Sequence, residues 1–69
     1  MRQMHVYRRR DGDYILVPCP SQYDGVGDGV LYLGVIAAAA FGAELHAWIV
    51  AQLAEHEFAQ LTPRQFFGR

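Results

Sequence analysis

The sequence predicts an α+β domain in which an antiparallel β-hairpin packs against one long C-terminal helix, followed by a short final helical turn. Three observations lead to this prediction. Two strand-like runs flank an Asp-Gly pair near the N-terminus, a helix-like run covers residues 35–61, and a helix-start motif begins at Thr62. A three-stranded sheet, with residues 30–33 as its third strand, stays open as an alternative.

The N-terminal hairpin is predicted from residues 4–10 and 13–17, which are rich in strand-forming side chains. The Asp11-Gly12 pair between them indicates a two-residue loop, because a type I′ turn needs positive φ at both central positions. In that register Tyr7 faces Leu16. A Pro-Cys-Pro run then ends the second strand, since proline donates no hydrogen bond to a ladder.

A long loop is predicted over residues 21–29, where glycines and aspartates alternate. Three glycines ahead of a helix are reminiscent of phosphate-binding loops. A dinucleotide motif, however, needs glycine where Val30 stands, and a P-loop needs a lysine, which this chain lacks entirely. Asp24 and Asp28 would also repel phosphate. The sequence therefore predicts an ordinary surface loop here.

The helix is predicted from four consecutive alanines with the highest helix propensity. Large apolar residues then recur at helical spacing, at Phe41, Leu45, Trp48, Ile49 and Leu53. We expect this face, Trp48 included, to be buried. A parallel row of small residues, at Ala39, Ala43, Ala47, Ala51 and Ala54, would allow another backbone to approach closely. Gly42 marks either a close crossing or a break.

The final turn is predicted from Thr62, Pro63 and Gln65. Threonine suits the N-cap, proline suits the first helical position, and glutamine three residues after the cap completes a capping box.

Length and composition predict one small domain, residues 1–69, that gains stability by self-association. A core of this size rarely supplies more than ~3–5 kcal/mol without a disulfide, a metal or a second subunit. Cys19 is the single cysteine, so no internal disulfide forms. The apolar content of 52% leaves more apolar surface than so short a chain buries. We therefore expect a homodimer in which helix packs against helix.

A cytoplasmic protein without a membrane span is expected. Residues 30–43 are uncharged, but a span needs about 20 apolar residues and Glu44 ends the run. The N-terminus is too polar for a signal peptide. A lone cysteine also fits a reducing compartment.

No catalytic or metal-binding spacing is present, so neither an enzyme nor a cofactor is expected. The candidate metal ligands are His5, His46, His56 and Cys19, and none stands at zinc-site spacing from another. Cys19 as a nucleophile would need a histidine and an orienting acid beside it, and the sequence indicates no such arrangement.

The leading functional prediction is a small protein-binding module. Arginine and tyrosine are enriched in binding hot spots, and aspartates add electrostatic selectivity at an interface rim. We expect the partner to contact Arg8, Arg9, Arg10, Tyr23, Asp24 and Asp28. The same arginines beside tyrosines are also typical of nucleic-acid-binding ribbons, which gives a nucleic-acid-binding regulator as the alternative. The net charge of −1 disfavours that alternative.

The size of the chain gives this prediction a more specific form. A chain that runs from Met1 to Arg69 without a catalytic constellation is expected to be a free-standing accessory protein. Such proteins include phage or mobile-element inhibitors that cover the surface of a bacterial host or defence complex. A small membrane-associated protein is a third reading.

Overall fold

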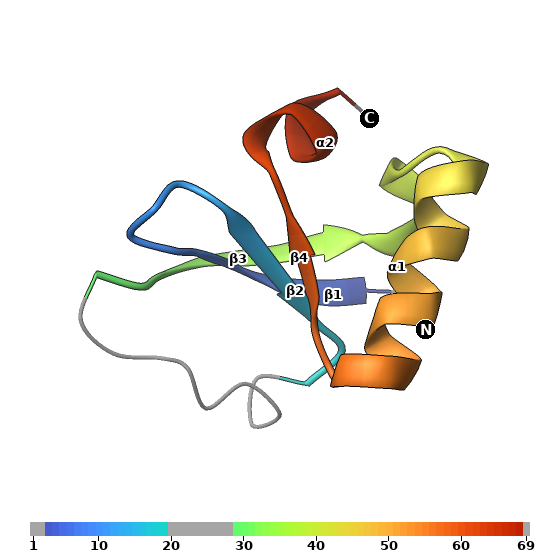
Figure 1. Ribbon diagram of the computed structural model, residues 1–69, viewed down its shortest axis with the longest axis horizontal. Helices are drawn as coiled ribbons and strands as arrows, with labels where there is room; N and C mark the ends of the chain where they lie inside the picture. The colour runs from blue at the N-terminus through green and yellow to red at the C-terminus, as the bar shows by residue number, and fades with distance from the viewer. Residues whose placement is uncertain (1–2, 20–28, 69) are drawn as a thin grey trace.

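The computed structural model describes residues 3–19 and 29–68, which form an α+β fold (Figure 1). The elements in chain order are β1 (Gln3–Arg8), β2 (Tyr14–Val17), β3 (Leu31–Ala37), the 3₁₀ helix η2 (Ala38–Ala40), α1 (Ala43–His56), β4 (Ala59–Leu61) and α2 (Pro63–Phe67). The predicted α+β fold class is confirmed. The described sheet has four strands, whereas the prediction gave a two-stranded hairpin or a three-stranded sheet.

The sheet has the strand order β3-β1-β2-β4, and all neighbouring strands are antiparallel. The N-terminal hairpin therefore occupies the centre. The two later strands flank it, β3 beside β1 and β4 beside β2. Helix α1 packs on one face of this sheet, and α2 follows β4 directly (Figure 1).

The predicted hairpin is present, but the predicted register is wrong by one residue. Tyr7 pairs with Ile15, not with Leu16. The Arg9 N–H donates to the Asp13 carbonyl at 2.7 Å and the Gly12 N–H donates to the Arg9 carbonyl at 3.0 Å, which closes a three-residue loop. Gly12 alone in that loop has positive φ, at 98°. This is a turn followed by one left-handed residue, so the predicted type I′ turn is also wrong.

The shift by one residue decides which side chains form the main core, because neighbouring residues of a strand point to opposite faces. The face that carries α1 holds Met4, Val6, Tyr14 and Leu16, all buried. The opposite face holds Tyr7, Ile15 and Val17, packed with Val30 and Phe58. Both faces of β2 are therefore covered, as its position in the centre of the sheet requires.

The predicted helix over residues 35–61 is divided among four elements, which are the end of β3, η2, α1 and β4. Val35 pairs with His5, so it lies in β3. Residues 31–33 belong to the same strand, which is the third strand that the sequence left open. Gly42 is the N-cap of α1, which confirms a break at this glycine. At the other end Glu57 adopts a left-handed conformation, with φ 69°, and the chain continues into β4. The long helix was overpredicted because the helix propensity of alanine is weak, and pairing of residues 35–37 with β1 and of residues 59–61 with β2 overrides it.

Helix α1 presents Leu45, Ile49 and Leu53 to the sheet, and Ile49 is completely buried. Trp48 is 37% exposed, so its predicted burial is wrong. Trp48 directly precedes Ile49, and consecutive residues are about 100° apart around a helix, so the two side chains point in different directions. The predicted alanine row lies on the outer side, where Ala43, Ala47, Ala51 and Ala54 are all exposed.

The capping box before α2 is confirmed. The Gln65 N–H donates to the Thr62 hydroxyl at 3.2 Å, and the Thr62 N–H donates to Gln65 Oε1 at 2.9 Å. This cap fixes a five-residue helix whose Phe66 ring stacks on Tyr14, with ring centroids 4.2 Å apart. Neither α1 nor α2 is long and apolar enough to cross a membrane.

Candidate functional site

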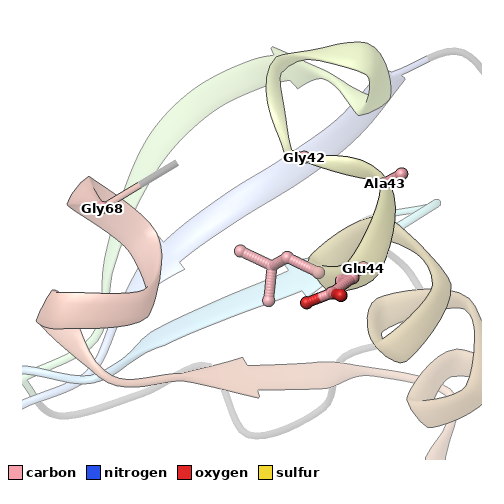
Figure 2. A pocket seen from close by; sticks show the side chains of 5 residues that line it. Gly42, Ala43, Glu44 and Gly68 are labelled. Atoms are coloured by element: carbon pink, nitrogen blue, oxygen red, sulfur yellow. The ribbon is translucent and has the colours of Figure 1, made fainter.

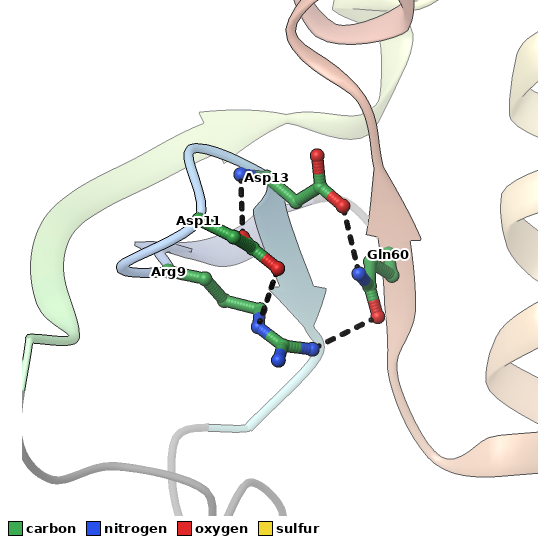
Figure 3. A network of polar contacts seen from close by, with 4 residues as sticks. All are labelled: Arg9, Asp11, Asp13 and Gln60. Atoms are coloured by element: carbon green, nitrogen blue, oxygen red, sulfur yellow. Dashed lines mark hydrogen bonds and ion pairs between the residues drawn. The ribbon is translucent and has the colours of Figure 1, made fainter.

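Arg9, a predicted partner contact, is held by contacts within the chain (Figure 3). Its guanidinium Nη1 donates to Gln60 Oε1 at 3.2 Å, and its Nε lies 3.6 Å from an Asp11 carboxylate oxygen. Arg9 thus joins the hairpin loop to β4. That an external partner also contacts Arg9 stays a prediction.

Gln60 completes this network. Its Nε2 donates to the Asp13 carboxylate at 2.8 Å, and the Asp13 N–H donates to the Asp11 carboxylate at 3.0 Å (Figure 3). One neutral side chain therefore binds an arginine with its oxygen and an aspartate with its nitrogen. The arrangement stabilises the loop and one edge of the sheet, and the two aspartates offset the positive charge of Arg9.

The other predicted contact residues do not gather into one site. Arg8 is exposed at the end of β1, where it pairs with Tyr14 and Leu31. Arg10 is exposed in the loop, and its side chain passes so close to Gly29 that a Cβ there would lie 2.9 Å from the Arg10 Cβ. The predicted contacts Tyr23, Asp24 and Asp28 lie outside the described residues.

A hollow of about 380 Å³ lies between the first turn of α1 and the end of α2 (Figure 2). Its lining is Gly42, Ala43, Glu44, Leu45 and Gly68, so Glu44 supplies the only ionisable side chain. A carboxylate at this position interacts favourably with the positive end of the α1 dipole. Within residues 3–19 and 29–68 no three histidine, cysteine or acidic side chains cluster to hold a metal ion. The hollow therefore offers no set of groups for acid–base or metal chemistry.

The described surface also includes an exposed apolar strand, β3. Leu31, Tyr32, Leu33 and Val35 are 58%, 54%, 52% and 53% exposed. The strand pairs with β1 on one side, and no described strand pairs with it on the other. An edge strand presents a row of backbone N–H and C=O groups to any further strand. Within the described part of the chain, β3 thus combines an edge that no strand pairs with and exposed apolar side chains.

The opposite edge of the sheet is protected, which makes the contrast with β3 informative. β4 is three residues long, Ala59 and Leu61 are buried, and Gln60 is engaged in the polar network. β3 is seven residues long, and residues 29–43 carry neither charge nor proline. Its one protective device is a bulge beside Gly34, whose φ is 114°. A bulge twists an edge and interrupts regular pairing.

Tyr32 fixes the open strand against β1. Its hydroxyl and His5 Nδ1 share a hydrogen bond at 2.9 Å, and its ring centroid lies 5.2 Å from that of Tyr7. These contacts span the pair β1–β3, so the strand is held in an extended form ready for further pairing. This surface was missed at the level of sequence because residues 35–37 were assigned to the helix. The β-branched and aromatic run 30–36 was the signal for it.

Neither a protein-family model, nor a curated protein, nor a solved structure matches this chain.

Proposed function

We propose that this chain is a non-enzymatic protein-binding module that receives an extended segment along the open edge of β3. The observation that carries the proposal is the exposure of four large apolar side chains on one edge strand. In strand addition, backbone hydrogen bonds supply affinity and alternate side chains supply selectivity. Leu31, Tyr32, Leu33 and Val35, divided between the two faces of the strand, would supply that selectivity.

The chemistry of the strand favours a protein over a nucleic acid. Nucleic acids are bound through cationic side chains, and β3 has none. Of the three clustered arginines, Arg9 is engaged with Gln60 and Asp11, and only Arg8 and Arg10 are exposed. The net charge of −1 also gives the chain no general attraction to phosphate.

A module of this kind acts by covering a surface of its partner. An inhibitor of a bacterial host or defence complex, encoded by a phage or mobile element, is one form of the proposal. Its support is the same exposed strand.

Affinity capture with matched variants tests the proposal. The unmodified chain, Leu33→Arg and Val50→Arg are used as baits in one lysate, after circular dichroism confirms that each is folded. Val50 is the control because it is 44% exposed on α1, comparable to Leu33 on β3. We expect Leu33→Arg to lose at least 10-fold of the captured protein and Val50→Arg to keep it. Retention by Leu33→Arg with loss by Val50→Arg would place the binding surface on the helix instead.

A salt titration addresses the nucleic-acid alternative. Phosphate contacts give an affinity that falls steeply with salt, whereas strand addition between neutral segments does not. Binding of DNA or RNA that weakens steeply with salt, and that Arg8→Ala with Arg10→Ala abolishes, would overturn the protein-binding proposal.

A further inference from the structure

We infer that the segment which pairs with the β3 edge is the β3 strand of a second copy of this chain, so that two subunits form one continuous eight-stranded antiparallel sheet. The inference rests on the proposed function, because it assigns an occupant to the same edge. The sheet order would then be β4-β2-β1-β3 followed by the partner's β3-β1-β2-β4, with both open edges removed.

Charge is the first argument for a second copy. A twofold interface brings the same patch of both subunits together, so any charge in it meets its own copy. Like charges opposite one another across a strand pair are destabilising. Residues 29–43 contain no charged side chain, and this stretch includes all of β3. A strand that pairs with a foreign segment does not need to be neutral, because a charge on one strand can face an opposite charge on the other.

The bulge in β3 limits the register. Tyr7 pairs with Tyr32 and Val6 pairs with Gly34, so Leu33 is the extra residue and has no partner residue in β1. The bulge divides β3 into the regular segments 31–32 and 34–37. The longer segment, 34–37, can pair with its copy without including the bulge, and Leu33 then lies directly beside the paired residues.

The fold determines how the two copies are related. Two antiparallel copies of one edge strand are related by a twofold axis perpendicular to the sheet. Helix α1 packs on one face of the sheet (Figure 1), so the α1 helices of both subunits would lie on the same face of the eight-stranded sheet.

The test uses the purified chain alone. Light scattering and sedimentation are measured from about 1 to 500 µM for the unmodified protein, Leu33→Arg and Val50→Arg. Amide hydrogen exchange of residues 31–37 is followed over the same concentrations in the unmodified protein, so that the result does not depend on any variant folding. We expect a dimer whose dissociation constant rises at least 10-fold in Leu33→Arg. We also expect exchange within residues 31–37 to slow by at least 10-fold as the concentration rises.

Three outcomes overturn the inference. The first is a monomer at every concentration. If Leu33→Arg still abolishes capture of a foreign protein in that case, the proposed function stands although the inferred dimer does not. A dimer that Leu33→Arg leaves intact and Val50→Arg abolishes would place the contact between α1 helices. A dimer with exchange at residues 31–37 independent of concentration would place the contact away from β3. If no copy and no foreign protein binds, the proposed function fails as well.

Discussion

The side-chain amide of Gln60 donates a hydrogen bond to the carboxylate of Asp13 at 2.8 Å, although 47 positions separate the two residues in the chain. The contact joins the tip of the first hairpin to the last strand of the sheet. β4 pairs with β2 over only three residue pairs, so this side-chain contact adds substantially to a short backbone ladder.

Replacing Gln60 by alanine should lower the free energy of unfolding by about 1–2 kcal/mol, because hydrogen bonds to both Asp13 and Arg9 are lost. Urea denaturation followed by circular dichroism measures the change. Gln52→Ala is the matched control, since Gln52 is also half-buried but lies on α1, and its effect should stay within about 0.5 kcal/mol. Equal effects of the two substitutions would show that the network contributes little.

Gly12→Val should destabilise the protein by about 1–2 kcal/mol through the backbone alone. The φ of Gly12 is 98°, and a Cβ there would meet no atom within 4 Å, so there is no steric clash to add. Gly12→Asn should cost less, because asparagine tolerates the left-handed region. Thermal unfolding of both variants gives the comparison, and an equal loss from asparagine would contradict this account.

Gly42→Ser should stabilise the protein by about 0.5 kcal/mol, because α1 begins at a residue without a side-chain cap. The φ of −63° at Gly42 suits any residue, and a Cβ there meets nothing within 4 Å. The melting temperature should rise by roughly 2–4 °C for a domain of this size. Gly42→Ala is the control, as it adds a Cβ without an acceptor and should give no such gain.

Ile49→Ala should cost about 2–5 kcal/mol, whereas Trp48→Ala should cost only about 1–2 kcal/mol despite the larger side chain. Ile49 is completely buried and Trp48 is 37% exposed. Denaturation of the two variants tests the ranking. Acrylamide should also quench the tryptophan fluorescence of the folded protein readily, and a strongly protected tryptophan would contradict the assignment.

Features encoded within a few residues were predictable from the sequence. The capping box at Thr62 and the hairpin around Gly12 were both located correctly. The hairpin register was not, because an Asp-Gly pair serves two-residue and three-residue loops alike, and Asp11 does not adopt positive φ here.

Features that depend on distant partners were not predictable. Residues 35–37 and 59–61 are strands because β1 and β2 offer them pairing partners, and this tertiary contact overrides the helix propensity of their alanines. The end of α1 was hidden as well, since Glu57 takes the left-handed position that glycine usually marks. The exposed edge of β3 was missed for the same reason, because residues 35–37 were assigned to the helix. That a partner contacts the predicted arginines stays a prediction. Their division, with Arg9 in an internal network and Arg8 and Arg10 exposed, could not be predicted from the sequence.

The position of β4 in the sheet has a consequence for how the protein is made. The chain leaves the ribosome N-terminus first at roughly 5–20 residues per second, so Ala59 follows Leu16 by about 40 residues, or some 2–8 s. During that interval β2 has β1 on one side and no partner on the other, while its apolar residues are already synthesised. A nascent chain therefore carries a second open strand edge that the finished protein does not have. Completion of the sheet depends on β4, Ala59–Leu61, and a chain truncated before Ala59 would keep that edge permanently and be prone to aggregate.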